Sequence, residues 1–335
     1  MPVDGRVDVR EALGKLAVRL AGEGARVSEA QRLTGGASAE TWAFTVEAPS
    51  GRQELILRRR TAPTDPETSR STSLAAEAAL IRAVAARGAP APPFVHLCDE
   101  RDGLGEAHVT RRVAGETLGR RINTDPKFDA VRPLLARQCG EVLAQIHATP
   151  PPAAANLKFA DAAIELDRYE EVYRASGAER PVLELAFRHL RAHLPEPRTP
   201  VMLHGDFRNG NLMISPETGL AAVLDWELSH IGDPAEDMGW LCTNSWRFSR
   251  PDRPVGGFGE YADLLAGYEA AGGEPVPLER VRFWQTLGSL KWGVMCLTMY
   301  MSWATGGSTS VERPMIGRRV SETEIDLINI LEAGL

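Results

Sequence analysis

The stretch VMLHGDFRNGNLMISPETGLAAVLDWELSHIGDPAED, residues 201–237, decides the fold of this chain. Within it, the apolar segments 212–214 and 221–224 flank the turn SPETG, which is the pattern of a short β-hairpin. Polar residues border the hairpin on both sides, because Asp206 and Asn211 precede it and Asp225 follows it. The sequence therefore predicts an acid, an amide and a second acid at the open end of a hairpin.

The spacing of these residues predicts a metal site. If the hairpin closes about Thr218, Asn211 and Asp225 oppose each other, and directly opposed Cβ atoms are about 5 Å apart. An amide oxygen and a carboxylate at that separation can share a hard cation such as Mg²⁺. Asp206 lies on the loop before the hairpin and could accept a proton from a substrate hydroxyl. Any one of these residues alone is more often a turn former, so the interpretation depends on the whole set.

Three motifs in this stretch resemble the aminoglycoside phosphotransferase family, which is similar in fold to choline kinases and protein kinases. They are HGDxxxxN (204–211), LDW (224–226) and GDPxxD (232–237). The resemblance implies an α+β, protein-kinase-like fold of two lobes, with a small β-rich N-terminal lobe and a larger helical C-terminal lobe. It also implies ATP and Mg²⁺ as cofactors.

The resemblance assigns roles to single residues. It makes Asp206 the catalytic base and Asn211 and Asp225 the ligands of Mg²⁺, a division of labour known from kinases. Arg208 matches the basic residue that protein kinases carry two positions after the base, so we expect it to steady the transferring phosphoryl group. An ordinary surface arginine is an equal alternative for Arg208.

The N-terminal part carries a second set of candidate residues. Residues 41–46 alternate as a strand does, and a second short strand covers residues 55–57. Before them, Gly35, Gly36 and Ser38 lie where the family has its phosphate-covering turn. Glycines let backbone N–H groups approach phosphate oxygens, and the serine adds a hydroxyl, although most Gly-Gly turns are ordinary hairpin turns.

Arg58 ends the second strand, where the resemblance places a phosphate-binding lysine. An arginine is always charged and can bind phosphate through two nitrogens, so it can replace that lysine. Glu77 lies on the apolar stripe of a helix predicted over residues 74–87, and a buried acid needs a partner. We therefore predict an Arg58–Glu77 pair, with Arg59 or Arg60 as the partner if the strand register differs.

The chain changes from β-rich to helical near Gly115, which predicts a nucleotide-binding lobe over 1–112. The lobe over 113–335 then carries the catalytic loop and the acceptor pocket. The segment VTRRVAG (109–115) resembles the family's hinge, where backbone groups hold adenine. Arg111 and Val113 are therefore expected to border the nucleotide.

Composition narrows the class of partner. The 335 residues carry a net charge of −7, whereas a nucleic-acid groove needs a basic domain, so we expect no nucleic-acid partner. No apolar run is long enough to span a bilayer and the N-terminus lacks the pattern of a signal peptide. The four cysteines form no CxxC pair and read as reduced thiols, so we expect a cytoplasmic protein with no membrane partner. The oligomeric state stays open.

The predicted function is ATP- and Mg-dependent phosphorylation of a hydroxyl group on a small molecule. Residues 237–303, expected to shape the acceptor pocket, hold seven acids and six bases, a poor match to a polycationic aminoglycoside. The same region has several tryptophans, and Lys291 lies in an apolar helix, where it either reaches water or meets an anion. The residues expected near the acceptor are Trp240, Trp246, Trp284, Trp292, Arg247 and Lys291.

We therefore expect an apolar or anionic acceptor of the hydroxyacyl type. The kinase-like domain fused to some acyl-CoA dehydrogenases, which is similar in having Leu-Arg at the position of Arg58, points the same way. Two alternatives stay open. One is a kinase of aminoglycosides or other antibiotics, and the other is a nucleotide-binding module without catalysis.

Overall fold

The computed structural model describes residues 8–33, 39–60 and 71–334. Its chain divides into two compact units. Unit 1 comprises Met1–Ala114, Thr149–Leu157 and Ala221–Ser229, and unit 2 comprises Gly115–Ala148, Lys158–Leu220 and His230–Leu335. The predicted phosphate-covering residues Gly35, Gly36 and Ser38 lie outside the described residues.

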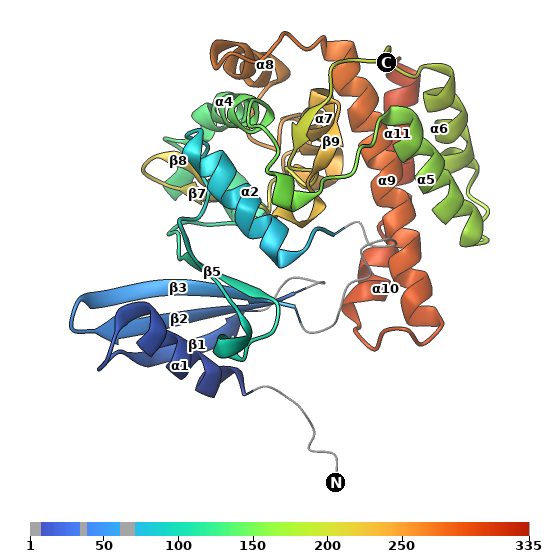
Figure 1. The fold of residues 1–335 in the computed structure, drawn as a ribbon. Helices are drawn as coiled ribbons and strands as arrows, with labels where there is room; N and C mark the ends of the chain where they lie inside the picture. Colours follow the sequence, from blue (N-terminus) through green and yellow to red (C-terminus); the bar gives the residue numbers. More distant parts are fainter. Residues whose placement is uncertain (1–7, 34–38, 61–70, 335) are drawn as a thin grey trace. The chain divides into compact units, whose positions relative to one another are not determined.

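Unit 1 is built on a five-stranded antiparallel sheet with the strand order β1-β2-β3-β5-β4 (Figure 1). The strands predicted from alternation lie within β2 and β3. The first strand was not predicted, because β1 is an edge strand whose side chains are mostly exposed, so it has no apolar alternation. The bounds are β1 (Arg26–Leu33), β2 (Glu40–Ala48), β3 (Gly51–Arg59), β4 (Phe94–Leu97) and β5 (Ala107–Arg111).

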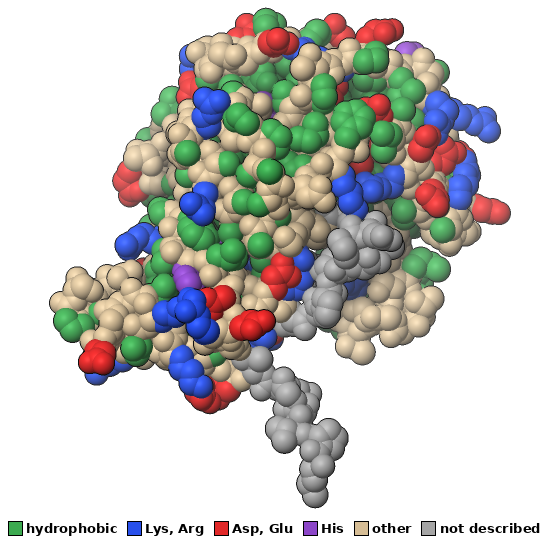
Figure 2. Space-filling model, in the orientation of Figure 1, with side chains coloured by type: hydrophobic (Ala, Val, Ile, Leu, Met, Phe, Trp, Pro, Cys, Tyr) green, Lys and Arg blue, Asp and Glu red, His purple; other side chains and the backbone are tan. Residues whose placement is uncertain are grey.

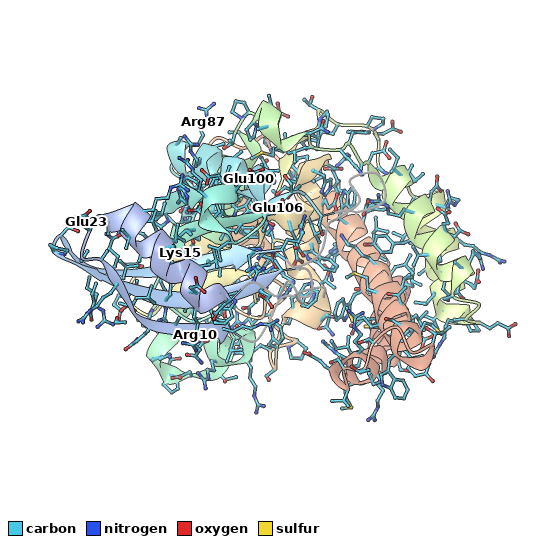
Figure 3. All side chains as sticks on the ribbon, turned by 60° about the horizontal axis from the view of Figure 1, so that its bottom comes forward. Arg10, Lys15, Glu23, Arg87, Glu100 and Glu106 are labelled. Atoms are coloured by element: carbon cyan, nitrogen blue, oxygen red, sulfur yellow. The ribbon has the colours of Figure 1, made fainter. Side chains whose placement is uncertain are left out.

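Helix α1 (Val9–Ala21) packs along one face of this sheet (Figure 1). The carboxylate of Asp8 accepts hydrogen bonds from the first backbone N–H groups of the helix, so it acts as its N-cap. Leu16 is fully buried against the sheet, whereas Arg10 and Lys15 lie on the exposed side of the helix (Figure 3).

Helix α2 (Leu74–Ala86) begins at Ser73, whose hydroxyl accepts a hydrogen bond from the N–H of the third helical residue at 3.0 Å. The helix packs against β4 and β5 and against the short 3₁₀ turns η4 (Ala153–Ala155) and η5 (Trp226–Leu228). This packing buries Glu77 and directs it into the interior of unit 1. A further 3₁₀ turn, η1 (Glu100–Asp102), connects β4 to β5.

Unit 2 is mostly helical, which together with the sheet of unit 1 confirms the predicted fold class. Its longest helix is α9 (Leu278–Ala304), against which α5, α6, α7, α10 and α11 pack. The other bounds are α3 (Gly119–Thr124), η2 (Pro126–Phe128), η3 (Arg132–Leu134), α4 (Leu135–His147), α5 (Ala162–Ala175), α6 (Pro181–Ala192), α7 (Pro234–Cys242), η6 (Asn244–Trp246), α8 (Tyr261–Ala270), α10 (Glu312–Gly317) and α11 (Val320–Ala333).

Short strands frame the segment that decides the fold. Strand β6 (Val201–Leu203) leads into it and pairs antiparallel with β9 (His230–Gly232). The predicted hairpin is formed by β7 (Leu212–Ser215) and β8 (Gly219–Val223). Helix α7 follows β9, and no amphipathic pattern predicts it, because all nine of its residues are buried.

Acidic and basic side chains are interspersed on the face drawn in Figure 2, in keeping with the near balance of charges in the sequence. Within the described residues, no helix is long and apolar enough to cross a lipid bilayer.

The crossing of α4 and α8 depends on glycines. A Cβ atom added to Gly140 would lie 2.0 Å from the carbonyl oxygen of Leu264 and 2.6 Å from the backbone nitrogen of Tyr268. Since these are backbone atoms, the two helices would have to separate. This contact matters for the site, because α4 and α8 carry the ring pair of His147 and Tyr268.

We predict that Gly140→Ala lowers the free energy of unfolding by about 2–3 kcal/mol, because the added methyl group meets backbone that cannot turn away. Gly14→Ala is the matched control, since a Cβ atom at Gly14 in α1 has no neighbour within 4 Å. That variant should gain about 0.5–1 kcal/mol from helix propensity. Chemical denaturation of the full chain measures both, and equal effects would contradict the close helix crossing.

Candidate active site

The loop between β6 and β7 carries the HGDFRNGN motif, and all of it belongs to unit 2. Two of its glycines, Gly205 and Gly210, have positive φ angles of 80° and 121°. These conformations favour glycine and let the loop reverse direction on either side of Asp206. At Gly210 a Cβ atom would also lie 2.5 Å from Nη1 of Arg208.

Asp237 anchors this loop. Its side chain is fully buried and accepts hydrogen bonds from the backbone N–H groups of His204 at 2.8 Å and Gly205 at 2.9 Å. Nε2 of His147 lies 3.2 Å from the same carboxylate, and Nδ1 of His147 lies 3.0 Å from the hydroxyl of Tyr268. Burial acts to raise the pKa of Asp237, but the hydrogen bonds with His147 and with the loop hold that pKa below its ordinary value.

The carboxylate of Asp206 is held by three side-chain donors. Oδ1 accepts from Nε1 of Trp240 at 2.6 Å and from Nε of Arg208 at 3.0 Å, and Oδ2 accepts from Nδ2 of Asn211 at 2.6 Å. A carboxylate has about four acceptor positions, two on each oxygen. The contacts fill both positions on Oδ1 and one on Oδ2. Asp206 therefore keeps one acceptor position, on Oδ2, for a further donor.

The amide nitrogen of Asn211 donates hydrogen bonds within the loop. Its Nδ2 group donates to the backbone oxygen of Asp206 as well as to Oδ2 of that residue. Among the described residues, no hydrogen bond to Oδ1 of Asn211 is present. An amide oxygen in this condition is a suitable ligand for a hard cation.

Arg208 lies against an aromatic surface. Its guanidinium carbon is 4.5 Å from the ring centroid of Trp246, and its Nε donates to Asp206. The stacked, hydrogen-bonded side chain is fixed in orientation, and its terminal nitrogens have no partner among the described residues. An arginine in this state can bind an anionic group.

The residues expected near the acceptor divide into two groups. Trp240 and Trp246 adjoin the Asp206 loop with ring centroids 5.1 Å apart, and Trp292 continues this aromatic cluster 4.9 Å from Trp246. Trp284 and Arg247 serve other purposes. The Trp284 indole donates to the helix-capping Asp233, and the Arg247 guanidinium binds the carbonyl oxygens of Cys242 and Pro251.

The second group of candidate residues lies within unit 1. Nε of Arg58 is 3.3 Å from Oε2 of Glu77, which is the predicted pair, and neither Arg59 nor Arg60 replaces Arg58 in it. Nη2 of Arg58 also lies 2.6 Å from Oδ1 of Asp225 and 3.0 Å from Oε2 of Glu227. Three carboxylates therefore surround one guanidinium.

Arg58 is held firmly by this cluster. Burial acts to lower the pKa of Arg58, but Glu77, Asp225 and Glu227 outweigh it and raise the pKa above its ordinary value. Asp225 has φ 68° and ψ 69°, a left-handed conformation that costs a residue other than glycine about 1–3 kcal/mol. Such conformations concentrate at functional sites, which agrees with the role predicted for Asp225.

The predicted hinge residues lie at the end of β5 in unit 1. The backbone N–H of Arg111 donates to the carbonyl oxygen of Pro93 at 2.8 Å, and Val113 follows the strand. The role of both residues beside adenine stays a prediction, as does a metal site shared by Asn211 of unit 2 and Asp225 of unit 1.

Sequence reasoning missed two contacts of the site. It placed Trp240 near the acceptor but did not pair its indole with Asp206, which lies 34 positions earlier. It also gave no role to Asn209, whose buried Nδ2 group donates to the carbonyl oxygen of Gly256 at 2.8 Å and so holds the loop from its far side. Both partners are distant in sequence, and no local pattern marks them.

A third polar cluster in unit 1 resembles a metal site only in composition. Potential ligand atoms of His96, Cys98 and Asp102 lie within 4.8 Å of one another. However, Arg19 already supplies a cation to Asp102 at 2.7 Å. Burial raises the pKa of Cys98 to about 12, so its thiol stays protonated. The cluster braces α1 against η1.

The fold is shared with solved structures of small-molecule kinases. A candidate aminoglycoside phosphotransferase from Ralstonia eutropha JMP134 is 20% identical, with a TM-score of 0.73 over 96% of this chain and 98% of that one. The macrolide 2′-phosphotransferase MphH of Brachybacterium faecium is 21% identical, with a TM-score of 0.61 over 92% and 97%. A choline/ethanolamine kinase family protein from Mesorhizobium loti is 22% identical, with a TM-score of 0.59 over 96% and 94%. At these identities the likeness shows the fold alone.

Curated relatives are larger proteins. Acyl-CoA dehydrogenase family member 10 of Mus musculus is 28% identical over 200 residues, which are 57% of this chain and 18% of that protein. The probable acyl-CoA dehydrogenase IBR3 of Arabidopsis thaliana is 24% identical over 331 residues, 90% of this chain and 39% of that protein. The chain therefore spans well under half the length of these relatives.

The sequence model of the phosphotransferase enzyme family, abbreviated APH, matches residues 29–273. The match covers most of the chain and includes the loop of Asp206, the hairpin and helix α7. This chain belongs to the phosphotransferase enzyme family, whose solved members with the same fold include kinases of small molecules.

Proposed function

We propose that this protein transfers the γ-phosphoryl group of ATP to a hydroxyl group of a small molecule, with Asp206 as the catalytic base. The observation that carries the proposal is the single acceptor position left on Oδ2 of Asp206, while its other positions are filled by Trp240, Arg208 and Asn211. A carboxylate fixed in this way can accept a hydroxyl proton in one defined direction.

The chemical step follows from this position. The substrate O–H donates to Oδ2 of Asp206, and its proton moves to that oxygen as the hydroxyl oxygen bonds to the γ-phosphorus of ATP. The bond from the γ-phosphorus to the β–γ bridging oxygen breaks, and ADP leaves with that electron pair. The free terminal nitrogens of Arg208 are suited to hold the charge on the transferring group.

The donor set fits a magnesium ion. Asn211 offers an amide oxygen with no hydrogen-bond partner among the described residues, and Asp225 contributes one of the carboxylates around Arg58. We propose that Asn211 and Asp225 hold Mg²⁺, which when bound neutralises charge on the phosphate oxygens. In keeping with this, a spectinomycin phosphotransferase of the same fold has been solved with ADP.

The rest of the nucleotide site is proposed on the family pattern. Gly35, Gly36 and Ser38 would cover the phosphates, while Arg58, oriented by Glu77, would approach them and Arg111 and Val113 would border the adenine. Unit 1 would then serve the nucleotide and unit 2 the acceptor. Free cysteines suit a reducing compartment, so we place the protein in the cytoplasm.

For the acceptor we propose a hydroxyacyl compound. The relatives named as acyl-CoA dehydrogenases support this class. The aromatic surroundings of Asp206, with rings of Trp240, Trp246 and Trp292 in contact, support an apolar body. The unpartnered nitrogens of Arg208 suit a substrate or transition state with negative charge.

One observation favours a second candidate function, a nucleotide-binding module without catalysis. The charge of Arg58, which stands where the family has a phosphate-binding lysine, is already matched by three carboxylates. In that case the chain would bind nucleotide but transfer no phosphoryl group. Measuring ADP formation with a panel of hydroxyl compounds separates the two functions.

Asp206→Asn should lower kcat for phosphoryl transfer by about 100-fold or more, because the amide cannot accept the proton. ATP affinity should stay within about two-fold, since the base acts on the acceptor. Radiolabelled phosphoryl transfer and calorimetry measure the two quantities. If the variant turned over at the wild-type rate, Asp206 would not be the base.

Asp225→Ala should weaken Mg·ATP binding by about 10-fold or more, because it removes a charged metal ligand. With EDTA present, the variant and the wild type should bind ATP more nearly alike. The matched control is Glu54→Ala, since Glu54 is an exposed carboxylate of unit 1 that pairs only with Arg52 on the surface. An equal loss of affinity with and without magnesium would exclude Asp225 as a ligand.

Steady-state kinetics should favour hydroxyacyl thioesters over kanamycin-type aminoglycosides as acceptors. The physical reason is that acidic and basic residues nearly balance in residues 237–303, whereas a pocket for a polycation needs an excess of acids. An aminoglycoside kcat/KM of about 10⁴ M⁻¹s⁻¹ or more, in the normal enzyme range, would instead identify an antibiotic kinase.

A further inference from the structure

Lys291 is a buried cation that is linked to Asp206 through Trp240. Only 6% of the residue is exposed, so its side chain does not extend into solvent. Nζ lies 4.7 Å from the ring centroid of Trp240, 5.8 Å from that of Tyr169 and 3.9 Å from Oε1 of Glu236. Of the two sequence-based alternatives for Lys291, this position matches the one in which the lysine meets an anion, here the carboxylate of Glu236.

The same tryptophan contacts Asp206. The face of Trp240 receives the ammonium of Lys291, while its Nε1 donates to Oδ1 of Asp206 at 2.6 Å. A cation over an indole ring draws electron density toward itself, which makes the N–H group a stronger donor. Among the described tryptophans, Trp240 alone has both a cation over its ring and an indole N–H group that donates to a carboxylate.

Glu236 holds Lys291 from the other side. Its Oε1 faces Nζ of Lys291 and its Oε2 lies 3.1 Å from Nε2 of His230. Glu236 and Trp240 are both on α7, four residues apart, so they present to the same side of that helix. The lysine is therefore fixed over the ring by a carboxylate from the helix that carries the ring.

We propose that Trp240 and Lys291 are positioning residues for phosphoryl transfer. This inference rests on the proposed function of Asp206. The indole N–H of Trp240 occupies Oδ1 of Asp206, so that only Oδ2 faces the acceptor. Lys291 acts through the ring of Trp240, which strengthens that hydrogen bond, and it contacts neither the acceptor nor the nucleotide.

This arrangement changes how the acceptor must be recognised. Because Lys291 is committed to Trp240 and Glu236, it cannot supply a positive charge to an anionic acceptor. Among the residues described around Asp206, Arg208 is then the cation whose terminal nitrogens can bind an anionic acceptor. Replacing Lys291 should accordingly change kcat and leave KM for an anionic acceptor nearly unchanged.

The contact can be tested without knowing the acceptor. In protein labelled with ¹⁵N-tryptophan, each of the seven tryptophans gives one indole N–H signal. Trp240→Phe assigns its signal by removing it. Asp206→Asn should displace the Trp240 signal more than any other, because the charged acceptor is lost, and Lys291→Met should displace it in the same sense. The Trp226 signal is the internal control, since that indole donates to a backbone oxygen in unit 1.

Steady-state kinetics then test whether Trp240 and Lys291 affect kcat, with hydroxyacyl thioesters and with water as acceptors of the phosphoryl group. Trp240→Phe should lower kcat by about 10-fold and Lys291→Met by about 3-fold, with KM for ATP unchanged. Lys291→Arg should restore most of the activity, because it keeps the cation, and Lys291→Gln, which also removes the cation, replaces the Met variant if that variant fails to fold.

The proposal is overturned if Asp206→Asn leaves the Trp240 signal in place, or if removing the cation changes neither the signal nor kcat. A rise in KM for the acceptor in Lys291→Met, with kcat unchanged, would also overturn it and make Lys291 a binding residue. If the signals respond as expected but the wild type transfers no phosphoryl group, the proposed function fails while the coupling of Lys291, Trp240 and Asp206 stands.

Discussion

The active-site loop depends on one buried carboxylate. Asp237 has no exposed surface, yet it receives two backbone N–H groups of the loop and a ring nitrogen of His147. A buried carboxylate is tolerated only when its oxygens accept hydrogen bonds. The hydrogen bonds that satisfy Asp237 therefore also fix the position of the loop. The close crossing of α4 and α8 extends this support, because it brings the hydroxyl of Tyr268 to the far side of the His147 ring.

The loop that Asp237 anchors in turn positions Asp206. The loop presents Asp206 in a setting where side chains from the loop and from α7 occupy three of its acceptor positions. In the proposed reaction, the orientation of Asp206 is thus set before any substrate arrives, which is the preorganisation that catalysis by positioning requires. Helix α9 contributes Lys291, which lies over the ring of Trp240, the residue whose indole donates to Asp206.

Much of this could be predicted from local patterns. The cap at Ser73, the hairpin and the Arg58–Glu77 pair follow from turn chemistry, alternation and an acid placed on an apolar stripe. Helix α7 could not be found in this way, because burial on every side removes the periodicity that marks a helix. The contact of Trp240 with Asp206 also escaped prediction, since tertiary packing alone brings the two residues together.

The backbone at Asp225 has a consequence for how this protein can change. Its left-handed conformation favours glycine, while its carboxylate forms an ion pair with Arg58, which Glu77 and Glu227 also contact. Asp225→Gly therefore relieves backbone strain but removes an ion pair with Arg58. The position therefore sets backbone strain against an ion pair, so a glycine here would ease the backbone and change the charge around Arg58 at the same time.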